Sequence, residues 1–325
     1  MQPTAGDIHV NRPLTNISVA YMNQEQQFIA DTVFPSVPVE LPSNLYYKYN
    51  KGEWFRTEAQ VRAPRTESVG SGWTMTTDSY HALVKAVHVD ITDMDRATQD
   101  RPVIDLDRDG TLFVTRDMLL RRELDFVNTY FKAGVWDGLP DQTGASSAAT
   151  NQFIQWNRAS SVPVEDFFNA RVRLGESTGY VPNVLVLGAY AYGALHNHAE
   201  ILERIKYTQK GIVTLDLLAA LFDIDKVVVP YVVQNTAAEG APTAMSYIYG
   251  KSALLVYAAP NAGLLQPSGG YTFEWTGYLG AQIHGTRMKK FRMEAIASDR
   301  VECEAAYDMK VVSSEMGAFW KTVVQ

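Results

Sequence analysis

Apolar and polar positions alternate most clearly near the C-terminus, in the segment DRVECEAAYDMK at residues 299–310. Every second residue from Val301 to Met309 is apolar, and most of the residues between them are charged. A period of two over this length predicts a β-strand with one buried face and one solvent-exposed face. The preceding segment TRMKKFRMEAIA, residues 286–297, is expected to pair with this strand as a hairpin.

A period of 3.6 residues predicts a long helix at residues 111–133. One apolar face of this helix contains Leu120, Leu124, Val127 and Phe131. The same reasoning predicts further helices at residues 164–175, 189–206 and 214–222. Short apolar segments alternate with helices between residues 181 and 275, a rhythm that is typical of an α/β or α+β unit.

The first 45 residues contain five prolines and are expected to form an extended arm. One short helix is predicted in it at residues 18–34, with Ser18 as its cap and with Ile29 and Val33 on one face. Two strand-like segments, NLYYKY and WTMTTDSYHALVKAVHVDIT, follow and are separated by a long polar segment. A loop of this length without a core pattern is usually functional or bound to a partner.

Composition narrows the class of protein. The 325 residues are 46% hydrophobic and 20% charged, which gives a globular chain with enough apolar mass for a sizeable core. The net charge of −7 argues against a broad nucleic-acid-binding surface. The single cysteine, Cys303, excludes a disulfide within the chain and fits a reducing cytoplasm. The N-terminal segment lacks the pattern of a signal peptide, and no apolar run approaches the length of a membrane span.

The segment ALHNHAEILERIKY, residues 194–207, concentrates two histidines and two glutamates and is the first candidate for chemistry. Metal ligands must converge on one point, and helix positions i and i+4 share a face whereas i and i+2 do not. His196 and Glu200 are compatible with one site, but His198 points elsewhere. We therefore interpret the segment as a helix with a polar face rather than as a metal site.

A second candidate, DLDRDGT at residues 105–111, matches the first half of a calcium-binding loop. The twelfth position of such a loop requires a bidentate glutamate, and here it is Arg116. We interpret the segment as a turn that leads into the long helix, with Asp109 or Thr111 as the capping residue.

Other catalytic patterns are absent from the sequence. YGKSALL, residues 249–255, lacks the first glycine of a phosphate-binding loop, and neither a nucleophile elbow nor a dinucleotide-binding glycine motif occurs. Cys303 lies on the apolar face of the predicted strand, where a packed thiol is expected. The sequence therefore predicts no enzyme activity, no cofactor and no metal.

Several segments together resemble the major capsid proteins of tailed phages. The longest of them is HNHAEILERIKYTQKGIVTLDLLAALFDIDKVVVPYVVQNTA at residues 196–237. GKSALLVY followed by GYTFEW, the ending DRVECEAAYDMKVVSSEMGAF, and the upstream segments FIADTVFPSVPV, YYKYNKGEWFR and RRELDFVN are similar too. The resemblance covers nearly the whole chain and follows the order of segments in that family.

This family has the Hong Kong 97 fold, which tailed-phage shells, herpesvirus capsid floors and encapsulins share. The resemblance implies an α+β chain in four parts. These are an N-terminal arm (1–45), an extended β-hairpin loop (46–85), a peripheral domain with a long spine helix and a β-sheet (86–180 and 276–325), and an axial domain (181–275).

The resemblance also implies a function. We expect the major capsid protein of a tailed double-stranded DNA bacteriophage, which self-assembles as hexamers and pentamers into an icosahedral head. The head encloses the genome without sequence-specific binding, and the expected location is the virion, after assembly in the bacterial cytoplasm. A separate scaffold protein and a portal are expected partners, a cement protein is a further candidate, and no membrane is involved. The alternatives are the shell protein of an encapsulin-type nanocompartment and, less favoured, a soluble α/β enzyme.

Inter-subunit contacts are expected at two places. The candidates in the extended loop are Lys48, Lys51, Trp54, Phe55, Arg56 and Arg62, and those in the axial domain are His196, His198 and Glu203. Trp54 and Phe55 would be exposed on a monomer, and exposed aromatic residues on a projecting hairpin predict burial against another subunit. Some relatives lock their shells with lysine–asparagine cross-links. No asparagine follows Asn261, so we expect none here.

Overall fold

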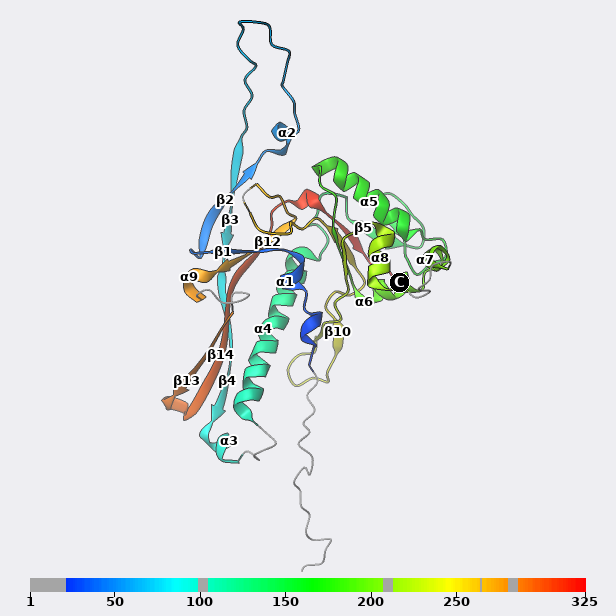
Figure 1. Ribbon diagram of the computed structural model, residues 1–325. Coiled ribbons are helices and arrows are strands. Elements are labelled where there is room, and N and C mark those ends of the chain that lie inside the picture. Colours follow the sequence, from blue (N-terminus) through cyan, green and yellow to red (C-terminus); the bar gives the residue numbers. More distant parts are fainter. Residues whose placement is uncertain (1–21, 99–104, 207–212, 264, 280–285) are drawn as a thin grey trace, which may run out of the picture.

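The computed structural model describes residues 22–98, 105–206, 213–263, 265–279 and 286–325. Two β-sheets organise the chain, and the long helix α4 lies along one of them (Figure 1). A hairpin projects away from the body beyond these sheets (Figure 1). No helix in the described part of the chain is both long enough and apolar enough to span a bilayer.

The first sheet has five strands and is centred on β14 (Ser298–Val311). Its other members are β1 (Ser36–Val39), β4 (Leu83–Thr92), β12 (Gly270–Trp275) and β13 (Thr286–Met293). β13, β12 and β4 pair with β14 in antiparallel fashion, and β1 adds to β12 in parallel. The predicted C-terminal hairpin is confirmed, and so is the burial of Cys303 and its apolar neighbours on the face toward α4. Burial raises the pKa of the Cys303 thiol to about 11, as expected for a packed side chain.

The helix α4 (Leu106–Tyr130) begins five residues before the predicted start, because Asp105 rather than Asp109 or Thr111 is its N-cap. Its buried residues are Val114, Met118, Arg122, Glu123, Phe126 and Tyr130. Leu120, Leu124 and Val127, which the helical period places on one face, are only half-buried. The fully buried positions include two charged residues instead, Arg122 and Glu123, which find partners inside the protein.

The second sheet has six strands in the order β6 (Gln152–Ile154), β5 (Gln142–Ala145), β15 (Gly317–Lys321), β11 (Ala253–Val256), β7 (Val184–Leu187) and β8 (Lys226–Val228). One face packs against the core around α4, and the other packs against a second core. The helices α5 (Pro163–Thr178), α6 (Ala189–His196), α7 (Ala199–Ile205) and α8 (Leu215–Phe222) contribute to this second core. Burial on both faces explains the uninterrupted apolar sequences of β7 and β11.

The two sheets do not follow the predicted domain limits at residues 180 and 275. β5, β6 and β15 come from segments assigned to the peripheral domain, yet they extend the sheet of β7 and β11. β12 falls inside the predicted axial segment, yet it pairs with β14. Strands that are distant in the sequence pair with one another, so each sheet contains strands from both predicted domains. Local patterning does not reveal such long-range pairing.

The arm and the hairpin precede these sheets. The described arm contains two short helical turns, η1 (Glu25–Gln27) and α1 (Ala30–Val33), in place of one continuous helix. Ser18, the predicted cap, lies outside the described residues, whereas Ile29 and Val33 are both buried as expected. The hairpin consists of β2 (Ser43–Tyr49) and β3 (Met75–His81), with α2 (Lys51–Trp54) after the first strand.

Short elements complete the described chain. They are α3 (Asp93–Thr98), the two-stranded sheet of β9 (Val233–Asn235) and β10 (Met245–Tyr247), α9 (Thr276–Leu279), η3 (Glu294–Ile296) and η4 (Ser314–Met316).

Candidate functional site

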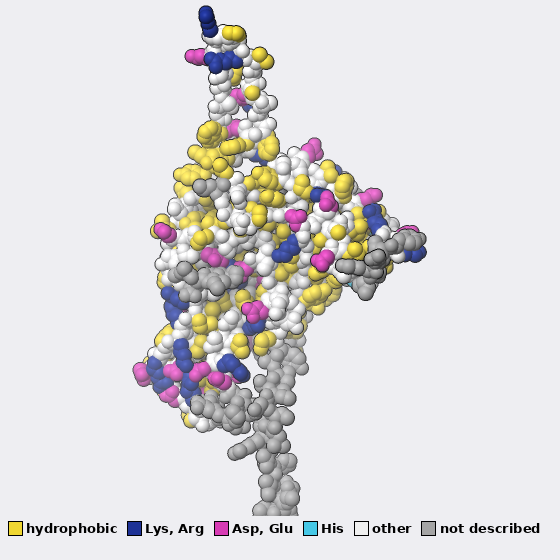
Figure 2. Space-filling model, viewed as in Figure 1, with side chains coloured by type: hydrophobic (Ala, Val, Ile, Leu, Met, Phe, Trp, Pro, Cys, Tyr) yellow, Lys and Arg dark blue, Asp and Glu magenta, His cyan; other side chains and the backbone are white. Residues whose placement is uncertain are grey.

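The base of the projecting hairpin carries a cluster of exposed aromatic residues, which we call the aromatic root (Tyr47, Tyr49, Trp54 and Trp73). The rings of Trp54 and Trp73 lie 6.4 Å apart, and Tyr49 meets Trp54 edge-on at 5.8 Å. Trp54 is 56% exposed and Trp73 is 63% exposed. Figure 2 shows hydrophobic side chains gathered at this base. Clustered, exposed tryptophan and tyrosine side chains are typical of the energetic centre of a protein–protein interface.

Glu53 fixes the relative positions of the side chains in the aromatic root. Its carboxylate accepts hydrogen bonds from the backbone N–H and, at 2.8 Å, from the hydroxyl of Thr74. These bonds lower the pKa of Glu53 below its ordinary value, so the carboxylate is ionised at neutral pH. The contact ties α2 to the strand that returns from the hairpin tip, and it thereby keeps Trp54 beside Trp73.

The structure gives three of the predicted contact residues partners within the same chain. Lys48 pairs with Asp78 at 2.9 Å inside the hairpin, and Lys51 pairs with Glu315 just before β15. The ring of Phe55 lies against Gly179, which ends α5 with a φ of 72° and leaves no room for a side chain there. Lys51 and Phe55 therefore brace the hairpin against the body of its own subunit.

The remaining two candidates in the hairpin, Arg56 and Arg62, are exposed. Arg62 donates a hydrogen bond to the carbonyl of Thr66 within the hairpin tip. Trp54, Arg56 and Arg62 are thus accessible to a second molecule.

The histidine-rich segment folds as two helices rather than one. α6 ends at His196, and His198 is the N-cap of α7, where its Nδ1 accepts a hydrogen bond from the backbone N–H of Glu200 at 3.3 Å. His198 is only 6% exposed, and its Nε2 lies 2.9 Å from Ser161 Oγ. Burial lowers the pKa of His198, so the ring is neutral at pH 7. These contacts engage His198 within its own subunit, and its contact with another subunit stays a prediction.

The pair of Ser161 and His198 is not arranged for nucleophilic catalysis. Because Nδ1 of His198 accepts a hydrogen bond, the ring proton resides on Nε2 and is donated to Ser161 Oγ. The hydroxyl of Ser161 in turn donates to the carbonyl of Arg158 at 2.6 Å. A catalytic histidine would have to accept the serine proton instead.

We predict that replacing His198 with alanine lowers the free energy of unfolding by about 1–2 kcal/mol, because α7 loses its cap and Ser161 loses a buried partner. Urea unfolding followed by circular dichroism measures this effect. His196 is the matched control, since it is half-buried and contacts Asn197 and the ring of Tyr192 at the surface. Equal losses in both variants would contradict the capping role.

His196 and Glu203 lie on separate short helices, and Glu203 is exposed. Within the described ranges, no three histidine, cysteine or acidic side chains come together as a metal site would require. In the segment that resembled a calcium loop, Asp105 caps α4, and Asp107 and Asp109 pair with cations. Asp107 pairs with Arg96 at 2.6 Å and with Lys290 at 3.0 Å, which holds its pKa well below the ordinary range.

The sequence did not predict a buried polar cluster that forms around two residues of α4. We call this cluster the arm junction, and its members are Asp31, Arg122, Glu123, Tyr249 and Glu274. Arg122 is 2% exposed and pairs with Asp31 of α1 and, at 2.5 Å, with Glu274 of β12. Glu123 is fully buried and accepts a hydrogen bond from the hydroxyl of Tyr249 at 2.5 Å. The junction joins the arm, the long helix, the first sheet and the turn that precedes β11.

One signal in the sequence marks the arm junction. Val114, Met118, Phe126 and Tyr130 are spaced by multiples of four, and Arg122 occupies the one position missing from that series. A charged residue inside a regular apolar series indicates a buried and paired charge as well as an exposed one.

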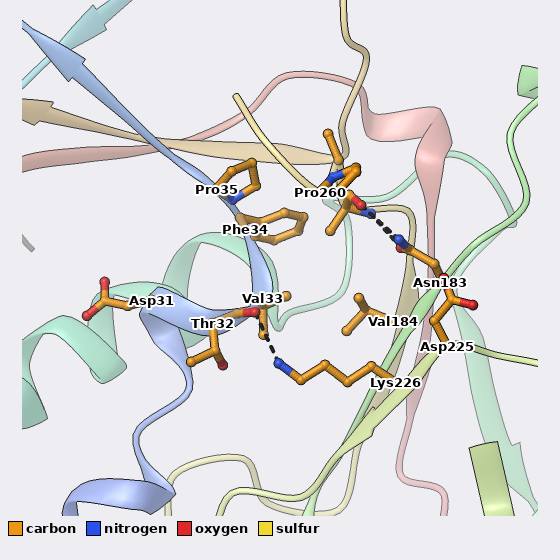
Figure 3. A pocket seen from close by; sticks show the side chains of 12 residues that line it. Asp31, Thr32, Val33, Phe34, Pro35, Asn183, Val184, Asp225, Lys226 and Pro260 are labelled. Atoms are coloured by element: carbon orange, nitrogen blue, oxygen red, sulfur yellow. Dashed lines mark hydrogen bonds between the residues drawn. The ribbon is translucent and has the colours of Figure 1, made fainter. Parts of the chain in front are cut away.

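A groove of about 330 Å³ lies between the arm and the second sheet (Figure 3). Lys226 of β8 reaches across and donates to the carbonyl of Thr32 at 3.4 Å. On the far side, the side-chain amide of Asn183 donates to and accepts from the backbone of Ala258 at 2.9 and 2.8 Å. These bonds fasten the arm to the sheet and fix the loop that lines the groove.

Comparison with known proteins identifies similar proteins over most of the chain. No family model matches the chain. It is 26% identical over 300 residues to the major capsid protein of Burkholderia phage BcepMu, covering 89% of this chain and 90% of that protein. A phage-related protein from Bordetella bronchiseptica RB50 has a similar structure, with a TM-score of 0.68 and 21% identity over 92% of this chain and 93% of that one. The capsid protein of cyanophage P-SCSP1u also has this architecture, with a TM-score of 0.63 and 10% identity over 99% and 95% of the two chains.

Proposed function

We propose that the chain, which has the Hong Kong 97 fold, is the major capsid protein of a tailed phage, and that its copies join into the icosahedral head through the aromatic root of the projecting hairpin. The aromatic root supports this proposal most directly. Two tryptophans that are more than half exposed on a projecting element lose that exposure when the hairpin lies on a neighbouring subunit. Burial of such side chains is the usual source of interface energy.

Charge complements this apolar contact. Residues 46–85 carry six lysines and arginines against four acids, while the chain as a whole has a net charge of −7. A positive hairpin is attracted to an acidic neighbour, and this attraction favours correct register more than it adds affinity. A closed shell requires heterologous contacts that repeat around rotation axes, and a hairpin that reaches the next copy supplies them.

We propose a role in the shell for each of the four parts of the family fold. Residues 1–45 act as the arm and residues 46–85 as the extended loop. The first sheet with α4 acts as the peripheral domain, and the helices and central strands between residues 181 and 258 act as the axial domain. Glu203 is exposed on α7 and is the proposed axial contact, together with His196.

We further propose a separate scaffold protein, a portal and a cement protein as partners, and assembly in the bacterial cytoplasm before DNA is packaged. The acidic net charge supports a shell that forms before the genome enters, because an acidic surface does not condense nucleic acid. DNA is then enclosed without sequence-specific recognition.

Negative-stain electron microscopy tests the proposed function. The chain is expressed alone and together with the other head proteins of its phage, and each product is separated by size exclusion. Closed icosahedral particles are expected from co-expression, and a monodisperse monomer under both conditions would contradict the proposal. Uniform shells from the chain alone would exclude only the need for a scaffold. Packaged DNA, rather than a cargo protein, distinguishes a phage head from an encapsulin.

Mature particles are predicted to give a single band of the monomer mass on a denaturing gel. Lys48 and Lys51 are engaged by Asp78 and Glu315, and no asparagine follows Asn261 to accept a lysine in an isopeptide bond. Particles boiled in detergent and reducing agent provide the measurement. A ladder of covalent multimers would show that a cross-link forms after all.

A further inference from the structure

The segment RRELDFVN at residues 121–128 was singled out by its resemblance to phage capsid proteins, and shell contacts leave its charges unexplained. In the structure, Glu123 connects three segments that are distant in the sequence. Its carboxylate accepts hydrogen bonds from the backbone N–H of Ile29 at 3.1 and 3.2 Å and from that of Ala30 at 3.0 Å. It also contacts the hydroxyl of Tyr249, 126 residues further along the chain.

Negative charge is in excess at this junction. The negative charge of Asp31 from α1 acts on Glu123 and raises its pKa, and the arm junction as a whole holds one arginine, Arg122, against three carboxyl groups. Arg122 pairs with Asp31 and Glu274, and no cation of the described residues forms an ion pair with Glu123. An ionised Glu123 would therefore be a buried charge beside another negative charge, which is energetically unfavourable.

The neutral form of Glu123 keeps its hydrogen bonds to the arm. When Oε1 is protonated, one hydrogen bond still joins it to the Tyr249 oxygen, while Oε2 still accepts from the backbone N–H groups of Ile29 and Ala30. Burial is the largest influence on this group and raises its pKa from 4.5 to about 7. Tyr249 is also fully buried, and its own pKa is raised well above 10, so the phenol keeps its proton.

We propose that Glu123 is a protonation-dependent latch that fastens the arm and the Tyr249 turn to α4 when it is neutral and holds them less firmly when it is ionised. The arm is otherwise held here by Asp31 and by the packing of Val33 and Phe34. Ionisation therefore loosens one contact point and leaves the fold intact. The latch rests on contacts within a single chain, so its failure would leave the assignment as a capsid protein unaffected.

The sign of the pH dependence follows from the two pKa values. In the closed state Glu123 titrates near 7, and in the opened state it approaches its ordinary value of 4.5. The closed state thus binds the extra proton, and closure is most stable at low pH. Opening becomes more favourable as the pH rises from about 4.5 to about 7, and it levels off above that range.

Hydrogen exchange of the backbone amides of Ile29 and Ala30 tests the latch in the unassembled full-length chain. After correction for the intrinsic pH dependence of exchange, protection in the wild type is expected to fall at least ~10-fold between pH 5 and pH 7.5. Glu123→Gln keeps the shape and the neutral charge at every pH, so its protection should change less than about 2-fold. Asp117→Asn, an exposed acid on the same helix, is the control and should behave as the wild type does.

Either of two results would overturn the latch. One is a wild-type protection factor that stays constant, or that changes only above pH 7.5, and this result needs no variant at all. The other is a Glu123→Gln variant with the same pH dependence as the wild type, which would assign the titration to a different group.

Discussion

Replacing Arg122 with methionine is expected to lower the free energy of unfolding of the subunit by about 3–5 kcal/mol. The substitution keeps much of the side-chain volume but removes the cation that pairs with Asp31 and Glu274. Glu274 is 7% exposed, and the two carboxylates would remain in the interior without their shared partner. Removing one member of a buried ion cluster costs more than removing the whole cluster, because the remaining charge stays desolvated.

The neighbouring Arg121 provides the matched control. Its side chain is 58% exposed, and its partner Asp125 also accepts hydrogen bonds from Lys85 and, at 2.7 Å, from Tyr307. Arg121→Met is therefore expected to change the free energy of unfolding by less than about 1 kcal/mol. Urea unfolding of both variants at pH 7 gives the comparison. Similar losses at the two positions would show that the burial of Arg122 contributes little to stability.

Changing both Trp54 and Trp73 to alanine is expected to abolish closed shells while the subunit remains folded. Each tryptophan is more than half exposed in the single chain, so truncation removes little intramolecular packing, and the free energy of unfolding should change by no more than about 1 kcal/mol. At an interface, truncating a central aromatic residue costs about 2 kcal/mol or more. Because the contact recurs at every subunit of the shell, the loss is multiplied across the assembly.

Size exclusion and negative-stain microscopy of this double variant provide the measurement, with co-expressed head proteins as for the wild type. The variant with phenylalanine at both positions keeps aromatic area at the hairpin base, and it should retain assembly in part. Normal shells from the double alanine variant would place the inter-subunit contact elsewhere on the hairpin, with Arg56 and Arg62 as the remaining candidates.

Local patterning predicted much of the fold correctly. The alternation around Cys303 predicted β14 and its pairing with β13, and the helical period predicted α4 and α5 to within a few residues of their ends. These elements can be predicted because the residues of a strand or a helix return to the same face at a fixed short interval along the sequence. The expected fold and class of protein came instead from the resemblance of several segments, in their order along the chain, to the major capsid proteins of tailed phages.

The same patterning failed where a polar group is buried. The predicted continuous helix at residues 189–206 is interrupted, because His198 satisfies the first N–H groups of α7 with its ring. Apolar periodicity continues across the break, since Leu195 and Ile201 are both buried. Only the hydrogen bond to Ser161, 37 residues away, reveals that His198 faces inward.

The sequence by itself determined the long helix, the C-terminal hairpin with the apolar face of β14, and the projecting hairpin with its aromatic side chains. Only the tertiary structure decided which face of α4 is buried, which strands join each sheet, and that Arg122 and Glu123 lie in the interior. Their partners are 152 residues away at Glu274 and 94 residues away at Ile29. Whether a charge can be buried depends on such distant partners, and a local pattern contains no information about them.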